Sequence, residues 1–130
     1  MMAQPDAQRR LVLHGAIILL VGLVCGYAAV AEEASRSGRA WQAAHSALLL
    51  LGVWLIATAA VLPLLELPRR EQNALLLSLI GGAYSFMTAV LIQAATGVRA
   101  ISPDVSGISL VAFVANLLAV LATILAASLT

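Results

Sequence analysis

The placement of charged residues constrains this chain more than any other feature of its sequence. All thirteen charges, seven basic and six acidic, lie within four short segments at residues 6–10, 32–39, 66–71 and 99–104. The uncharged stretches between them, at about 11–31, 40–65, 73–97 and 108–129, each supply the roughly 20 apolar residues that cross a bilayer. With 62% hydrophobic residues, the chain falls outside the range of soluble domains. We therefore predict an all-α membrane protein in which residues 1–130 form one integral membrane domain.

The connections between these spans are short and contain residues typical of turns. Ser37 and Gly38 occur in the first connection, Pro68 in the second and Pro103 in the third. Short connections make sequential helices antiparallel neighbours, so we expect a four-transmembrane-helix antiparallel bundle. Pro63, near the end of the second span, predicts a kink or an early helix end, because proline lacks a backbone N–H.

The first apolar stretch has a second interpretation. Arg9 and Arg10 precede it, and it ends in Ala29-Val30-Ala31, which resembles a signal-peptide cleavage site. The apolar run is long for a signal peptide, so we expect a true transmembrane span.

The arginines predict an orientation in the membrane. Four lie on the side of the N-terminus and the second connection, against three on the opposite side: Arg9, Arg10, Arg69 and Arg70 against Arg36, Arg39 and Arg99. Basic residues that flank spans tend to remain in the cytoplasm. We therefore expect the protein among the lipids of a bacterial inner membrane, with both termini cytoplasmic.

The distribution of charge also argues against several functions. A net charge of +1 offers no basic surface for nucleic acid. The spans contain no Asp, Glu, Lys or Arg, so proton relays and ion pathways built on carboxylates have no side chains to use. The single cysteine, Cys25, excludes an internal disulfide and is interpreted most simply as a small packing residue.

Small residues four positions apart predict close contacts between helices. Three such pairs occur: Gly22 with Gly26, Ser78 with Gly82, and Ala115 with Ala119. They indicate tight packing within the bundle or within an oligomer.

Two histidines, His14 and His45, are the span residues best suited to chemistry. An imidazole in hydrocarbon must be hydrogen-bonded or ligated, because an unpaired polar group is costly there. Counting residues from opposite ends of antiparallel spans separates the two rings by roughly 18 Å in depth. They therefore cannot be the two axial ligands of one haem, either in one chain or in a parallel oligomer. For His14 we expect a structural hydrogen bond, to the end of the fourth helix or to Gln72 or Asn73.

His45 has the better surroundings for a flat cofactor. Helical spacing puts Trp41, Leu49 and Gly52 on its face, so that an aromatic ring and an open glycine surface would flank the imidazole. Arginines on the same membrane side are suited to pairing with haem propionates: Arg36, Arg39 and Arg99. The alternatives are that His45 only bonds a neighbouring helix or reaches the interface, and that these arginines only anchor the protein at the interface.

The segment WQAAHS at 41–46, followed by Pro63 eighteen residues after His45, resembles the second helix of the styrene oxide isomerase family. His14-Gly15 and Gly52 are similar to that family too, and the similarity in hydropathy and loop order covers nearly the whole chain. The resemblance implies a tetraspan bundle that assembles as a homotrimer and binds haem b, with His45 as the axial iron ligand. It also implies a reaction in which ferric iron takes an epoxide oxygen as a Lewis acid, a C–O bond opens, a hydride shifts and an aldehyde forms.

The chain departs from this family at the positions that hold the substrate. The family's asparagine, aspartate and tyrosine match Leu51, Gly82 and Val90 here. Tyr84 and Ser85 lie near the middle position and could substitute in part. The first connection is also shorter than in the isomerases. These departures leave open whether the protein is an enzyme.

The sequence supports three hypotheses. The first is a haem-binding membrane protein on the isomerase scaffold, in which His45 ligates iron and the protein passes electrons to a partner, senses a diatomic ligand or carries haem. The second is a haem-dependent epoxide isomerase, with a pocket of Leu49, Leu51 and Val90 for a small apolar ligand. The third is a cofactor-free membrane subunit in which both histidines are structural.

Overall fold

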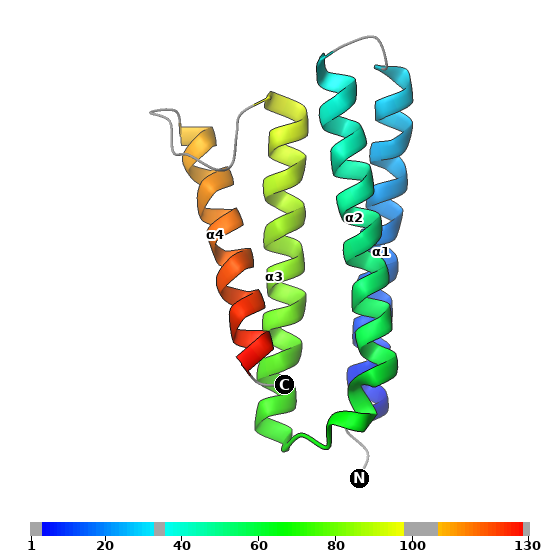
Figure 1. Ribbon diagram of the computed structural model, residues 1–130, viewed down its shortest axis with the longest axis vertical. Helices are drawn as coiled ribbons and strands as arrows, with labels where there is room; N and C mark the ends of the chain where they lie inside the picture. The colour runs from blue at the N-terminus through cyan, green and yellow to red at the C-terminus, as the bar shows by residue number, and fades with distance from the viewer. Residues whose placement is uncertain (1–3, 33–35, 98–106, 129–130) are drawn as a thin grey trace.

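The structure consists of long helices that run in alternating directions (Figure 1). The computed structural model describes residues 4–32, 36–97 and 107–128. The helices are α1 (Gln4–Ala31), α2 (Arg36–Val61), α3 (Arg69–Thr96) and α4 (Gly107–Ser128), and a 3-10 turn, η1 (Leu62–Leu65), follows α2. No strand occurs among the described residues, and all four helices are long and apolar enough to cross a membrane. The predicted fold class, an all-α protein of four transmembrane helices, is confirmed.

The helices begin before the uncharged stretches do. α1 includes Arg9 and Arg10, α3 begins at Arg69, and these arginines are exposed. The backbone hydrogen bonds of a helix do not depend on side-chain charge, and the long arginine side chain can keep its guanidinium in the headgroup region. Charge therefore marks where the bilayer ends, while the helix continues beyond it.

The turn residues had mixed outcomes. The α-helical part of α2 ends at Val61 and Pro63 lies in η1, so the predicted early end at this proline is confirmed. Pro68 caps the start of α3. Ser37 and Gly38, however, belong to the first turn of α2, so their assignment to a connection is wrong. The prediction for Pro103 lies outside the described residues.

The four helices form two closely packed hairpins. α1 packs along α2, and α3 packs along α4, whereas α2 and α3 touch over a smaller area. In Figure 1, α4 lies at the edge of the bundle beside α3, and α1 lies behind α2. Within the described part of the chain, α4 packs on α3 and on no other helix. Much of the surface of α4 is therefore left to lipid or to a partner.

Glycines allow the helices of each hairpin to approach closely. A Cβ at Gly22 would lie 3.2 Å from Leu48 and Leu49 of α2, and a Cβ at Gly82 would lie 2.8 Å from the Cβ of Ala122 in α4. The close contacts predicted for the pairs that contain these glycines are confirmed. Buried residues of α1 recur every seven positions at Leu11, Ile18 and Cys25, which is the spacing of a left-handed helix pair. Cys25 is thus the packing residue that the sequence indicated.

Candidate functional site

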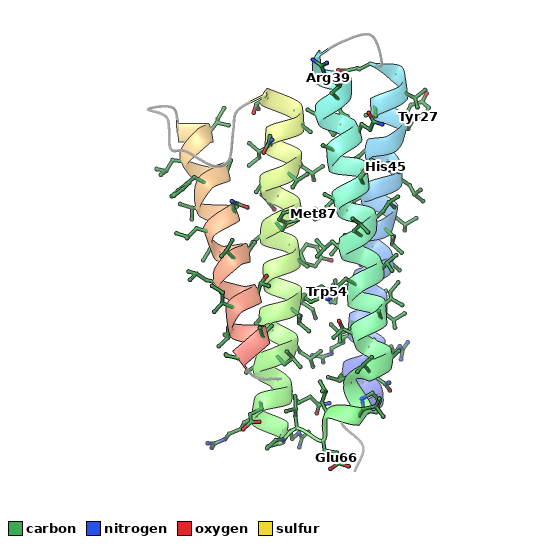
Figure 2. The ribbon with its side chains drawn as sticks, viewed as in Figure 1. Tyr27, Arg39, His45, Trp54, Glu66 and Met87 are labelled. Atoms are coloured by element: carbon green, nitrogen blue, oxygen red, sulfur yellow. The ribbon has the colours of Figure 1, made fainter. Side chains whose placement is uncertain are left out.

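His45 projects from α2 towards α1, near the end of the bundle opposite Glu66 (Figure 2). Its Nδ1 lies 2.8 Å from the carbonyl oxygen of Gly22. The ring covers Gly26, where an added Cβ would lie 2.7 Å from the imidazole Nδ1. The one-turn spacing of two glycines in α1 thus provides both an acceptor for the ring and the space that it occupies.

This hydrogen bond decides the state of the other ring nitrogen. A carbonyl oxygen can only accept, so Nδ1 carries the hydrogen and donates it, and Nε2 of the neutral ring has a free lone pair. Nε2 makes no hydrogen bond to a described residue. Every buried side-chain nitrogen and oxygen of the described residues does have a hydrogen-bond partner, so Nε2 is not fully buried. The hydrogen bond at Nδ1 therefore fixes the ring orientation and leaves Nε2 free to ligate a metal.

The other residues predicted around His45 are arranged differently from the expectation. Trp41 is partly buried and packs against the core. Leu49 meets Gly22 of α1. Gly52 is buried, and a Cβ there would lie 2.6 Å from Leu19 Cγ, so the expected open surface at Gly52 is wrong. The glycine surface of α2 is already covered by α1.

The predicted arginines are only partly described. Arg39 is exposed in the first turns of α2, towards the same end of the bundle as His45 (Figure 2). The Arg36 side chain and the whole of Arg99 lie outside the described residues.

His14 is paired with Tyr84 of α3, at 3.0 Å between Nδ1 and the phenol oxygen. The two rings meet edge to face, with centroids 5.6 Å apart. A structural hydrogen bond for His14 is confirmed, but the expected partners, namely the end of the fourth helix, Gln72 and Asn73, are wrong. His45 faces α1 between Gly22 and Gly26, eight to twelve residues beyond His14, which separates the histidines by about 12–18 Å along α1. The two rings therefore belong to different sites.

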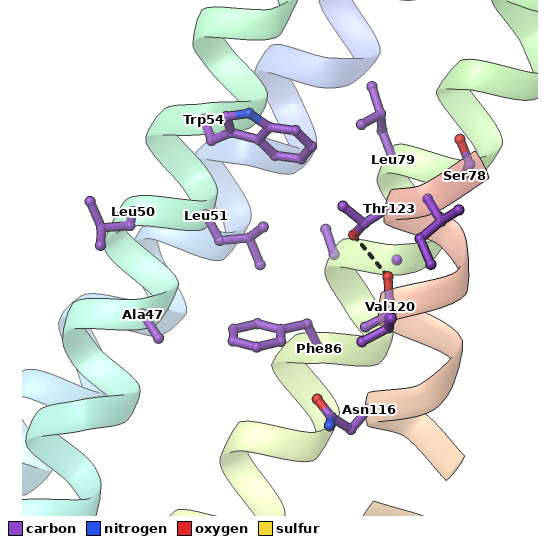
Figure 3. A pocket seen from close by; sticks show the side chains of 14 residues that line it. Ala47, Leu50, Leu51, Trp54, Ser78, Leu79, Phe86, Asn116, Val120 and Thr123 are labelled. Atoms are coloured by element: carbon purple, nitrogen blue, oxygen red, sulfur yellow. Dashed lines mark hydrogen bonds between the residues drawn. The ribbon is translucent and has the colours of Figure 1, made fainter. Parts of the chain in front are cut away.

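A cavity of about 770 Å³ lies on the other side of α2, between α2, α3 and α4 (Figure 3). Two of the pocket candidates, Leu51 and Gly82, line it together, whereas Val90 and Tyr84 do not. Val90 packs against the core and Tyr84 bonds His14. Of the three residues expected to form a pocket, Leu49, Leu51 and Val90, only Leu51 lines this cavity. The lining residues come from three helices: Ala47, Leu50, Leu51 and Trp54 of α2; Ser78, Leu79, Gly82, Ala83 and Phe86 of α3; and Asn116, Ala119, Val120, Thr123 and Ile124 of α4.

The cavity wall is apolar except for the indole N–H of Trp54 and three polar side chains. The Ser78 hydroxyl donates to the Leu75 carbonyl at 2.9 Å, and the Thr123 hydroxyl donates to the Ala119 carbonyl at 2.8 Å. Asn116 makes no hydrogen bond to any described residue, and its amide lies on the cavity side of α4 (Figure 3). The sequence marks Asn116 as one of the few polar side chains in the spans, but its position alone predicted no role for it.

His45 and the cavity lie on opposite faces of α2. At about 100° per residue, the cavity residues Ala47, Leu50, Leu51 and Trp54 are rotated by about 140–240° from His45. A group bound to the exposed nitrogen of His45 in one chain therefore does not face the cavity of that same chain.

These features define an integral membrane protein with four helical spans. It has a histidine, His45, whose Nδ1 bonds a backbone carbonyl, and a separate apolar cavity. A family model described as styrene oxide isomerase matches residues 7–130, so the chain belongs to the styrene oxide isomerase family. No curated protein matches the chain. No solved structure matches it either.

Proposed function

We propose that this protein binds haem b in the membrane, with Nε2 of His45 as the axial protein ligand of the iron. The observation that carries the proposal is the hydrogen bond from His45 Nδ1 to the Gly22 carbonyl. Histidines that ligate metals commonly donate their other ring N–H to a carbonyl or carboxylate, which sets the tautomer and the ring orientation. Membership of the styrene oxide isomerase family supports the same assignment.

The available donors suit haem better than a bare metal ion. The described residues contain no group of three or more His, Cys, Asp or Glu side chains that could enclose a metal. Haem brings four nitrogen ligands of its own and requires only one or two from the protein. When bound, haem would supply an iron that can change valence or act as a Lewis acid. Arg39, six residues or about 9 Å along α2 from His45, would pair with a propionate.

The position of His45 favours electron transfer, sensing of a diatomic ligand or haem carriage over epoxide isomerisation within one chain. Isomerisation needs the substrate pocket next to the iron, and the 770 Å³ cavity lies on the opposite face of α2. The family's substrate-holding side chains are also replaced by Leu51 and Gly82 in this cavity.

A haem-dependent epoxide isomerase is the second candidate. Family membership and an apolar cavity with two aromatic rings, Trp54 and Phe86, support it. This function requires an assembly, such as the homotrimer that the family resemblance implies, in which His45 of one copy approaches the cavity of another. The little-covered surface of α4 is compatible with such an assembly.

The test of haem binding is the absorption spectrum of protein purified in detergent from haem-sufficient cells. We expect a Soret band that His45→Ala abolishes and that the matched variant His14→Ala retains. A colourless wild-type preparation, or a band that survives His45→Ala, would refute the proposal. A colourless protein would instead favour the cofactor-free subunit.

Two further assays separate the functions of a haem-loaded protein. Incubation with styrene oxide should yield no aldehyde above a haem-free control if electron transfer, sensing or carriage is correct, and aldehyde formation would establish the isomerase. Reversible reduction or carbon monoxide binding would favour electron transfer or sensing.

A further inference from the structure

Pro63 leaves one backbone carbonyl of α2 without its helical partner. In an α-helix the carbonyl of Ala59 would accept a hydrogen bond from the N–H of residue 63, and proline has no N–H. The side chain of Gln8, in the first turns of α1, donates its Nε2–H to this carbonyl at 2.9 Å. Hydrocarbon offers no donor, so the carbonyl would otherwise be unpaired at an energetic cost. Gln8 therefore supplies from another helix the bond that Pro63 removes.

The segment that follows this bond has the features of a hinge. α2 gives way to the 3-10 turn η1, which lies beside the start of α1 at the end of the bundle (Figure 1). Glu66, which ends η1, has a left-handed backbone with φ of 44°. Hydrogen-bond geometry is poorer in a 3-10 turn than in an α-helix, and a left-handed residue other than glycine is strained. Leu62 is the one fully buried residue of η1. This leucine and the Gln8 bond are thus the main anchors of the segment.

η1 also forms part of the wall of a second cavity, the surface cavity, of about 410 Å³. Leu65 of η1 and Ala127 of α4 line it, and each lies at or next to the end of its span, so this cavity reaches the membrane surface. Its inner end adjoins the 770 Å³ cavity, the main cavity, because the two share three lining residues. The shared residues are Trp54, Leu79 and Thr123.

We propose that η1 is a hinged flap that joins the main cavity to water at the membrane surface when it swings away, and that Gln8 is the latch that holds it closed. The main cavity already opens sideways to lipid, because Leu50 lines it and is 73% exposed. That route suits apolar molecules, whereas a small polar molecule would have to pass η1, since hydrocarbon excludes it. The inference goes beyond the proposed function and requires no haem.

The test measures how fast a cationic methanethiosulfonate modifies Leu79→Cys, in a Cys25→Ala background and in lipid nanodiscs. Leu79 is 4% exposed and lines both cavities. The fixed charge keeps the reagent out of hydrocarbon, so it reaches this position only through water. Gln8→Leu should raise the rate about 3- to 18-fold, the effect of one hydrogen bond between membrane helices on the equilibrium between closed and open flap.

Pro63→Ala distinguishes the latch from a general loosening of the bundle. This variant returns a backbone N–H to the Ala59 carbonyl, so in its background Gln8→Leu should leave the modification rate unchanged. A purely structural role of Gln8 predicts instead that the rate rises whether or not residue 63 is proline.

The native Cys25 is the control for global unfolding, because it is 2% exposed and lies 17 residues, or about 25 Å, along α1 from Gln8. In a chain with leucine retained at position 79, its reaction with a membrane-permeant maleimide should be equally slow with and without Gln8→Leu. Gln8→Met, of similar length, replaces the leucine variant if that one does not accumulate. The inference is overturned if Leu79→Cys is never modified, if the Gln8 variants do not raise its rate, if the rise persists with Pro63→Ala, or if Cys25 becomes equally reactive.

Discussion

Replacement of Gly26 by alanine tests whether the packing of α1 against His45 sets the ligand geometry. An alanine Cβ at this position would lie 2.7 Å from Nδ1, 2.9 Å from Cε1 and 3.2 Å from Cγ of His45. Ordinary contacts begin near 3.4 Å, so the ring must withdraw by about 0.7 Å. The added Cβ would clash with the imidazole ring itself and not with the end of a flexible side chain. The Nδ1 to Gly22 distance, now 2.8 Å, would then exceed the hydrogen-bonding range.

The size of the effect follows from the lost hydrogen bond and from the displaced ligand. A hydrogen bond between membrane helices contributes about 0.6 kcal/mol on average and up to about 1.7 kcal/mol. Loss of a supporting bond to a metal ligand commonly weakens metal affinity about 10- to 100-fold. Alanine also favours the helix over glycine by about 1 kcal/mol, so the global stability of the variant should fall little. We therefore expect weaker haem binding by a protein that remains folded.

The assay is a haem titration of the haem-free protein, followed by Soret absorbance. The Kd should rise about 10- to 100-fold in Gly26→Ala, with a shifted band if residual haem binds. Gly81→Ala is the matched control, because a Cβ at Gly81 would meet nothing within 4 Å, and its Kd should equal that of the wild type. An unchanged Kd in Gly26→Ala, or an equal loss in Gly81→Ala, would refute the reasoning.

Three further predictions concern packing and orientation. Tyr84→Phe should lower the free energy of unfolding by about 0.6 to 1.7 kcal/mol through loss of the bond to His14, without changing the haem Kd. In a double-mutant cycle with His14→Leu, the two losses of unfolding free energy should not add. Additive losses would contradict the pairing. Gly52→Ala should destabilise the protein by about 1–3 kcal/mol relative to Gly81→Ala in chemical unfolding, because its Cβ would lie 2.8 Å from the Gly15 carbonyl, and equal stability of the two variants would argue against this contact. In a Cys25→Ala background, an impermeant maleimide applied to intact cells should label Gly107→Cys and not Glu66→Cys, and the reverse pattern would invert the predicted orientation.

The sequence alone determined the features that depend on solvent and on backbone chemistry. The positions of the charged residues located the four spans, because charge is excluded from hydrocarbon whatever the neighbouring helices do. Pro63 indicated the end of α2, because it lacks an N–H in any tertiary context. The histidine segment at 41–46 indicated a family that the match over residues 7–130 then established.

The tertiary structure decided which way each span faces. Helices in a membrane are apolar on all sides, so hydropathy does not show which face meets lipid and which meets a neighbour. For this reason Gly52 was expected to be open and is buried, His14 was assigned the wrong partners, and no role was predicted for Asn116. Only the packing of α1 on α2 turned His45 towards the Gly22 carbonyl, and only the arrangement of α2, α3 and α4 formed the cavity on the opposite face of α2. The sequence thus predicted the depth of each residue in the bilayer, but it did not predict the rotation of each helix about its axis.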